Sequence, residues 1–197
     1  MYKRCLVLGG KGFVGSHLTE ALLRRGMSVR VFDRPGAENL ISPELRDRVE
    51  FIEGNFANPE SIATALDGCD ICFHLISTTI PKTSNESPAY DLQSNALSSI
   101  NLLEQARKSG LRKIVFMSSG GTVYGIPKYL PIDESHPTDP LCSYGIAKLT
   151  IEKYLELYRV HYGIDYAVLR VSNPYGERQR LMAAQGAVAV FLGKALN

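Results

Sequence analysis

The chain has 197 residues, of which 45% are hydrophobic and 21% charged, and its formal net charge is +2. This composition allows one sizeable core, and the near-neutral charge gives no sign of a nucleic-acid partner. Because no run of 18 apolar residues is present and the N-terminus enters a strand almost at once, we predict no membrane partner and no signal peptide, and we expect a cytoplasmic protein.

Strand-like and helical segments alternate along the chain. Helical periodicity is found at residues 13–26, 59–66, 88–109 and 143–161. The alternation predicts an α/β fold with a doubly wound, mainly parallel sheet. The apolar runs typical of its buried strands lie at residues 4–8, 28–33, 49–53, 69–75, 112–118 and 164–171.

A glycine-rich loop joins the first predicted strand to the first predicted helix. Gly9, Gly12 and Gly15 form a G-x-x-G-x-x-G variant of the dinucleotide-binding fingerprint. Such spacing on its own is often an ordinary turn. Here the flanking strand and helix supply the context in which glycines let the backbone approach a pyrophosphate at a helix N-terminus. We therefore predict a dinucleotide-binding loop.

Asp33 ends the second predicted strand. An acidic residue about 20 positions beyond the glycine loop takes the ribose hydroxyls of an adenosine. Since a carboxylate there would repel a 2′-phosphate, Asp33 favours NAD over NADP. Arg34 follows it and keeps NADP open as an alternative.

Two of the four cysteines, Cys69 and Cys72, have the spacing of a redox or zinc pair. No second pair and no histidine cluster accompany them, so we predict no metal site. Residues three apart in a strand face opposite sides of a sheet. We interpret both cysteines as buried core thiols.

Tyr144 and Lys148 are one helical turn apart. Residues at i and i+4 share a helix face, so the lysine charge would favour the phenolate and let the tyrosine act as a base near neutral pH. An exposed pair on an amphipathic helix has the same spacing, and the pattern alone is therefore weak. Together with the glycine loop, it predicts oxidation or reduction of a carbinol with a nicotinamide.

Residues 181–197 have an apolar helical pattern that stops without a cap or polar tail, so the chain looks cut off.

The ordered motifs resemble the extended short-chain dehydrogenase/reductases, in particular the NAD-dependent epimerase/dehydratase family and its UDP-glucose 4-epimerase-like group. The resemblance implies an NAD-binding domain over residues 1–175, with a doubly wound Rossmann-type parallel sheet that carries helices on both faces. It also implies the start of a largely absent substrate-binding domain over residues 176–197. It rests on residues 9–15, Asp33, residues 54–56, 74–77, Asn95 with residues 101–104, and residues 118–125, 144–148 and 169–176.

The resemblance also implies roles for individual residues. Tyr144 would take the proton from the sugar 4-hydroxyl, and Lys148 would hold the nicotinamide ribose and lower the tyrosine pKa. Substrate contacts are expected at Thr79, Thr122, Tyr144 and Asn173. Cofactor contacts are expected at Gly9, Gly12, Phe13, Val14, Gly15, Asp33, Arg34, Asn55, Phe56, Leu75, Ile76, Ser77, Asn95, Ser118, Tyr144 and Lys148.

Three places depart from the family pattern. Gly120 stands where the family has a catalytic Ser or Thr, so Ser119, Thr122 or a water must supply that hydroxyl, and the branched side chain of Thr122 favours it slightly. Asn55 replaces an acid, although its amide can still accept a hydrogen bond from an adenine amino group. Residues 76–77 replace two small apolar residues beside the cofactor.

The resemblance implies an NAD-dependent nucleotide-sugar 4-epimerase that acts on UDP-glucose and UDP-galactose, or their N-acetyl forms, through a transient 4-keto sugar. Sugar 4,6-dehydratases carry Asp-Glu where this chain has Gly121 and Thr122, so that reaction is disfavoured. The alternatives are a nucleotide-sugar 4-ketoreductase and a non-catalytic NAD-binding relative. Little activity is expected from 197 residues. The family commonly dimerises through the helices near residues 88–109 and 143–161, so we expect a homodimer.

Overall fold

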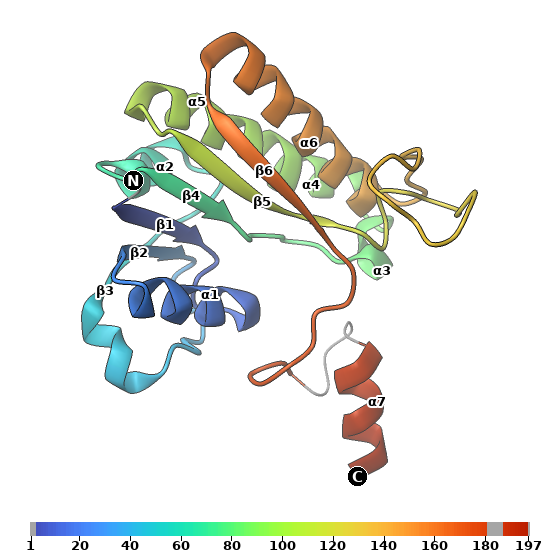
Figure 1. The fold of residues 1–197 in the computed structure, drawn as a ribbon, viewed down its shortest axis with the longest axis horizontal. Coiled ribbons are helices and arrows are strands. Elements are labelled where there is room, and N and C mark those ends of the chain that lie inside the picture. The colour runs from blue at the N-terminus through green and yellow to red at the C-terminus, as the bar shows by residue number, and fades with distance from the viewer. Residues whose placement is uncertain (1–2, 181–186, 197) are drawn as a thin grey trace.

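The computed structural model describes residues 3–180 and 187–196, which contain one parallel sheet with helices on both faces (Figure 1). Within these ranges, six strands follow the order β3-β2-β1-β4-β5-β6, and every neighbouring pair is parallel. This is the strand order of the Rossmann fold, so the predicted fold class is confirmed. The strands are β1 (Arg4–Leu8), β2 (Ser28–Asp33), β3 (Val49–Glu53), β4 (Ile71–His74), β5 (Lys113–Ser119) and β6 (Asp165–Val171).

The helices predicted at residues 13–26, 59–66 and 143–161 are present, with ends that agree within two residues. The predicted helix over residues 88–109 is interrupted by a π-helical turn, and two short helices, η1 and α3, were not predicted. The helical elements are α1 (Phe13–Arg24), η1 (Pro43–Arg48), α2 (Pro59–Leu66), α3 (Pro81–Ser84), α4 (Pro88–Asp91), the π-helical η2 (Leu92–Leu97), α5 (Ser98–Ser109), α6 (Ser143–Tyr162) and α7 (Ala187–Leu196).

The π-helical turn η2 coincides with side chains that bond outside the usual helical pattern. Ser98 Oγ donates to the carbonyl oxygen of Gln93, five residues earlier, at 3.1 Å. The Asn95 side chain is engaged with Asp91 and with the loop that follows β4. Apolar periodicity does not register these bonds, which explains why one continuous α-helix was predicted. Turns of this kind inside helices are frequent at functional sites.

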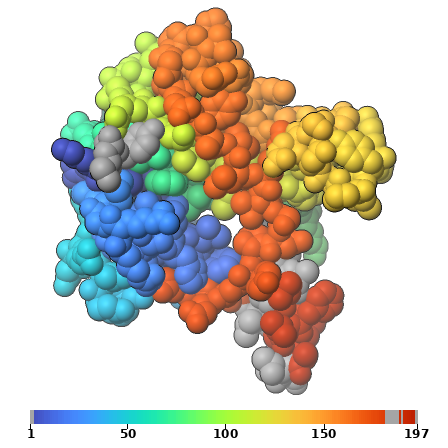
Figure 2. Space-filling view, viewed as in Figure 1, coloured from blue at the N-terminus to red at the C-terminus, as the bar shows by residue number. Residues whose placement is uncertain are grey.

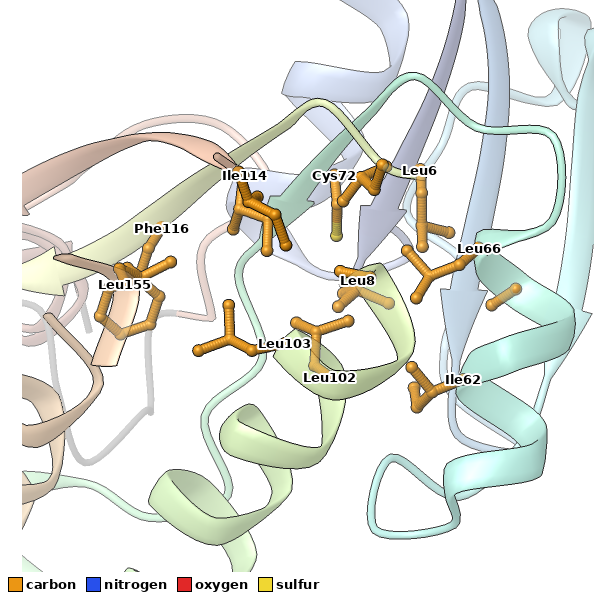
Figure 3. Close-up of a cluster of buried hydrophobic side chains, with 14 of the residues drawn as sticks. Leu6, Leu8, Ile62, Leu66, Cys72, Leu102, Leu103, Ile114, Phe116 and Leu155 are labelled. Carbon is orange, nitrogen blue, oxygen red and sulfur yellow. The ribbon is translucent and has the colours of Figure 1, made fainter. Parts of the chain in front are cut away.

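Two hydrophobic clusters lie on opposite faces of the sheet. Leu6 and Leu8 of β1 belong to one cluster, and Cys5 and Val7 belong to the other, as strand alternation requires. The first cluster packs the strands against α2, α5 and α6 (Figure 3), and the second packs them against α1. Each fully buried aliphatic side chain contributes about 1.5–3 kcal/mol to stability. This double coverage holds the carboxyl ends of the strands in fixed positions.

Cys69 and Cys72 are core thiols, as predicted, but their geometry differs from the prediction. Cys69 precedes β4 rather than lying in it, and both side chains enter the same hydrophobic cluster instead of facing opposite sides of the sheet. Burial raises the pKa of the Cys72 thiol well above its usual value. Among the described residues, no group of three or more His, Cys, Asp or Glu side chains could hold a metal ion.

The segment that follows β6 returns to the first helix. In Figure 2 this orange segment lies against the blue surface of α1. Three interactions fix it: the Glu177 carbonyl lies 3.0 Å from His17 Nε2, Arg178 pairs with the buried Glu20 at 2.8 Å, and Arg180 pairs with Glu38 at 2.8 Å. The helical pattern predicted over residues 181–197 is observed as α7, while residues 181–186 and 197 lie outside the described part of the chain. No helix in the described ranges is long and apolar enough to cross a membrane.

Candidate active site

Two neighbouring cavities open along the carboxyl ends of the strands, where parallel α/β sheets bind their ligands. The adenosine-side cavity, of about 680 Å³, lies beside the junction of β1 and β4, where the strand order reverses. It is lined by Gly9, Gly12, Phe32, Asp33, Arg34, Pro35, Gly54, Asn55, Phe56, Leu75, Ile76, Ser77, Thr78 and Tyr90. The tyrosine-side cavity, of about 480 Å³, is lined by Phe13, Pro81, Met117, Ser118, Ser119, Gly121, Thr122, Tyr144, Val171, Ser172, Asn173, Pro174 and Gln179.

The glycine loop leaves no space for a side chain at Gly10 and Gly15. Gly9 has a φ of +79°, a conformation that favours glycine. A Cβ on Gly15 would lie 2.1 Å from the Gly9 carbonyl oxygen, and one on Gly10 would lie 2.6 Å from a methyl of Val31. Gly12 caps α1 without a side-chain hydrogen bond, so the first amides of the helix receive no side-chain cap. These features fit a pyrophosphate at the helix N-terminus. Gly10 was not among the residues predicted to contact the cofactor.

Asp33 lies at the carboxyl end of β2 and lines the adenosine-side cavity. Its Oδ2 accepts the backbone N–H of Lys11 at 3.1 Å, and its Oδ1 accepts that of Arg34 at 2.9 Å. Each carboxylate oxygen has a further lone pair, so the ribose hydroxyls of an adenosine can still donate to it. The Asn55 side chain also lines this cavity, but its Oδ1 already accepts the N–H of Ala57 at 3.0 Å.

Asn95 and Thr79 support the loop after β4 and line neither cavity. Asn95 Oδ1 accepts the backbone N–H of Thr78 at 2.9 Å, and its Nδ2 donates to Thr79 Oγ1 at 3.1 Å and to Asp91 Oδ1 at 2.9 Å. Asp91 is fully buried and also accepts the Ser143 hydroxyl at the start of α6. The predicted contacts of Asn95 with cofactor and of Thr79 with substrate stay predictions. The network ties this loop to the helix that carries Tyr144.

Tyr144 and Lys148 share one face of α6, as their spacing predicts, and the Lys148 ammonium lies 5.4 Å from the centre of the tyrosine ring. The ammonium donates to the Met117 carbonyl at 3.0 Å and lies 4.8 Å from the Phe116 ring centre. Lys148 is 3% exposed, and this burial lowers its pKa to about 8, although Asp91 and Glu152 oppose the shift.

The expected lowering of the Tyr144 pKa by Lys148 is wrong for this state of the molecule. Burial raises the pKa of Tyr144, while a side-chain hydrogen bond with Ser77 acts in the opposite direction. Burial of the phenol is the largest cause of this shift, and the Lys148 ammonium donates its hydrogen bond to the Met117 carbonyl. The phenol is therefore protonated at neutral pH here.

The loop after β5 resolves which positions face Tyr144. Gly120 faces away, because a Cβ there would lie 2.7 Å from the Arg170 carbonyl oxygen on β6. Ser119 and Thr122 line the tyrosine-side cavity, and the buried Thr122 Oγ1 has no hydrogen-bond partner among the described residues. Ser118 donates its hydroxyl to the buried Glu152. Ser119 and Thr122 therefore both stay candidates for the hydroxyl that Gly120 does not supply.

Two of the three remaining predicted residues line a cavity. Phe13, the first residue of α1, and Asn173, which follows β6, both line the tyrosine-side cavity, whereas Val14 lines neither cavity.

Two buried charge pairs were not predicted from the sequence. Glu20 on α1 binds Arg178, and Glu152 on α6 binds Arg170 on β6 at 2.7 Å. A Glu on the apolar face of an amphipathic helix is the sequence feature that could have predicted each pair, because a buried carboxylate needs a partner.

Comparisons with known proteins agree with this geometry. The model of the NAD dependent epimerase/dehydratase family matches residues 5–196. A Methanocaldococcus jannaschii protein with the provisional name UDP-glucose 4-epimerase is 40% identical over 195 residues, which are 98% of this chain and 63% of the relative. An Escherichia coli dTDP-4-dehydro-6-deoxyglucose reductase is 30% identical over 198 residues, covering 98% of this chain and 62% of the relative.

A solved structure of Thermus thermophilus UDP-glucose 4-epimerase in complex with NAD superposes with a TM-score of 0.85 at 35% identity, covering 95% of this chain and 61% of that one. The chain thus spans less than two thirds of the length of these relatives. The glycine cradle and the fixed carboxylate of Asp33 fit the cofactor of the family, which is NAD. The chain belongs to the NAD-dependent epimerase/dehydratase family.

Proposed function

We propose that this chain is the cofactor-binding part of a nucleotide-sugar 4-epimerase that acts on UDP-glucose and UDP-galactose, or their N-acetyl forms, through a transient 4-keto sugar. The observation that carries the proposal is the placement of Tyr144, above Lys148 and beside the unpartnered hydroxyl of Thr122, in one cavity. A base, a nearby cation and a hydroxyl are the groups that carbinol oxidation and its reversal need.

Each of these residues has a distinct role in the proposal. Tyr144 acts as the phenolate, the form that the positive nicotinamide of NAD would favour beside the phenol once NAD is bound, so Tyr144 accepts the proton of the sugar 4-hydroxyl and later returns it. Thr122 or Ser119 binds the sugar oxygen during that transfer, since both residues line the same cavity as Tyr144. Lys148 supplies positive charge beneath the ring and binds the nicotinamide ribose. The chemistry that bound NAD would supply is reversible acceptance of a hydride from the sugar.

Two features favour epimerisation over other reactions of the family. Gly121 and Thr122 line the cavity where an elimination would need an additional acid and base, so a 4,6-dehydratase is disfavoured. The segment after β6 is tied to α1 by the buried Glu20–Arg178 pair, which supports a cofactor that stays bound between turnovers. A nucleotide-sugar 4-ketoreductase is the second candidate, and a non-catalytic NAD-binding relative is the third.

The test is interconversion of UDP-glucose and UDP-galactose, with the N-acetylated pair alongside and no cofactor added. Because the chain spans about 63% of a relative, we expect NAD binding but little turnover from the 197 residues, and the activity is measured on a chain of the relatives' length. Tyr144→Phe should abolish conversion while NAD binding persists. Conversion of a 4-keto sugar only when NADPH is added would instead establish the ketoreductase.

The domain division and the dimer are further parts of the proposal. We propose that residues 176–197 begin the substrate-binding unit and that α5 and α6 pair with a second copy. The dimer is supported by exposed apolar side chains on α6, where Leu157 is 41% and Val160 65% exposed. Sedimentation equilibrium tests it: Leu157→Lys should convert a dimer into a monomer, and a monomeric wild-type chain would refute it.

A further inference from the structure

Three charged side chains meet at the carboxyl ends of β2 and β3. Asp33 and Glu53 are paired neighbours on these strands, which places their backbones about 4.8 Å apart. Lys11, from the glycine loop, reaches both of them. Its backbone N–H donates to Asp33 Oδ2, and its ammonium forms an ion pair with the Glu53 carboxylate. Arg34 lies beside Asp33 and is exposed to solvent.

The Lys11 side chain is held away from the adenosine-side cavity. Its side chain is only 9% exposed, and its ammonium lies 5.7 Å from the centre of the Phe51 ring on β3. Neither Lys11 nor Glu53 lines the cavity, whereas Asp33 and Arg34 do. A buried ammonium requires a charge partner, and Glu53 is the partner that the structure provides.

We propose that Glu53 sets the preference of this chain for NAD over NADP by holding the Lys11 ammonium away from the position of a 2′-phosphate beside Asp33. Asp33, Glu53, Lys11 and Arg34 together carry no net charge, so a 2′-phosphate meets the carboxylate of Asp33 without a free lysine to offset it. Loss of the Glu53 charge leaves this cluster with a net positive charge and a mobile ammonium. A lysine side chain is flexible and binds phosphate as a point charge.

This proposal concerns the cofactor and does not depend on which sugar nucleotide is the substrate. Asp33 accounts for repulsion of a 2′-phosphate, but it does not explain why the neighbouring lysine fails to compensate. The ion pair with Glu53 supplies that explanation, because an ammonium already paired and packed on Phe51 gains little by moving. Glu53 is therefore a specificity-determining residue that acts through Lys11.

The decisive experiment is a competition for binding rather than an assay of turnover. Wild-type chain and Glu53→Gln are incubated with an equimolar excess of NAD and NADP, free nucleotide is removed, and the retained nucleotides are extracted and quantified. We expect the retained NADP-to-NAD ratio to rise on the order of tenfold in Glu53→Gln. Titration with adenosine 2′,5′-bisphosphate should show the same gain relative to 5′-AMP, and the gain should shrink at high salt.

Two matched variants separate the proposed cause from a general change of charge. Glu156→Gln removes another largely solvent-exposed carboxylate, which pairs with an arginine on α6 near the opposite edge of the sheet, and should leave the ratio unchanged. Lys11→Met in the Glu53→Gln background should abolish the gain. Glu53 is 47% exposed, so its variants should fold, and Glu53→Ala gives a second measurement.

An unchanged ratio in both Glu53 variants would overturn the proposal. So would a gain that survives Lys11→Met, because Arg34 would then bind the phosphate. An equal rise of the NADP-to-NAD ratio in Glu156→Gln would show that the ratio follows the net charge of the chain. That outcome would also refute the role of Glu53.

Discussion

The two ends of the cofactor cleft are constrained in different ways. At the adenosine side, backbone atoms define the site, since Gly15 packs on the Gly9 carbonyl and Asp33 is fixed by two backbone N–H groups. At the tyrosine side, buried charges define it, since Lys148 is 3% and Glu152 8% exposed. Tolerance to substitution is therefore limited at the adenosine side by the space around the backbone, and at the tyrosine side by the balance of buried charges. Substitutions at the two ends should fail for different physical reasons.

The largest effect is expected at the adenosine side, from Gly15→Ala. The added Cβ would lie 2.1 Å from the Gly9 oxygen and 2.6 Å from the Gly10 Cα, and backbone cannot yield as a flexible side chain does. We expect a loss of about 3 kcal/mol in the free energy of unfolding and no NAD binding. Urea unfolding and equilibrium dialysis measure the two effects. Gly121→Ala, which meets nothing within 4 Å, should unfold as the wild type does.

At the tyrosine side, Arg170→Met should cost about 3 kcal/mol, the lower end of the range for breaking a buried ion pair. The guanidinium contacts Glu152 through Nε and Nη2 and donates to the Tyr124 hydroxyl at 3.1 Å, so its removal leaves a buried carboxylate without its cation. Arg159→Met breaks an exposed pair with Glu156 and should cost less than about 1 kcal/mol. Equal losses in the two variants would contradict the proposed role of buried charge.

A smaller effect of opposite sign is expected for Lys148→Met, which removes a buried charge. Burial lowers the pKa of Lys148 from 10.5 to about 8, which corresponds to about 3 kcal/mol of destabilisation below pH 8. Loss of the hydrogen bond to the Met117 carbonyl costs the variant about 1 kcal/mol. The free energy of unfolding of Lys148→Met should therefore be about 2 kcal/mol higher than that of the wild type. Catalysis by a chain of full family length should be lost.

The pH dependence of this difference has a defined sign. Between pH 8 and 10.5 the unfolded chain keeps the lysine proton and the folded chain releases it, so wild-type stability rises with pH. The advantage of Lys148→Met should therefore be greatest below pH 8 and should disappear as pH approaches 10.5. Urea unfolding at a series of pH values checks this. A constant difference would mean that the lysine charge is already fully compensated.

Sequence patterns predicted the elements that depend on local chemistry. All six strands lie where apolar runs were found, and their ends differ from the predicted ones by two residues or fewer. The glycine loop was recognised because strand, turn and helix follow each other directly along the chain. Asp33 lines the adenosine-side cavity. So do eight further residues that were predicted to contact the cofactor: Gly9, Gly12, Arg34, Asn55, Phe56, Leu75, Ile76 and Ser77.

The errors have physical causes that periodicity does not contain. The π-helical turn arises from side-chain bonds of Asn95 and Ser98, and Cys69 shares a cluster with Cys72 because the chain bends before β4. The pKa of Tyr144 rises because burial of the phenol outweighs its hydrogen bond with Ser77. The i, i+4 spacing correctly predicted that Tyr144 and Lys148 share a helix face. It contains no information on how far either group is buried from water.

The sequence by itself determined the Rossmann topology, the glycine loop and the carboxylate at the end of β2, because strand alternation, glycine sterics and short spacings are local properties. Only the tertiary structure decided which way Gly120 faces, that Lys148 binds the Met117 carbonyl, and that the Lys11 ammonium is paired with Glu53. These depend on the distance between segments that are far apart in the chain. They also depend on how completely packing removes water from each charge.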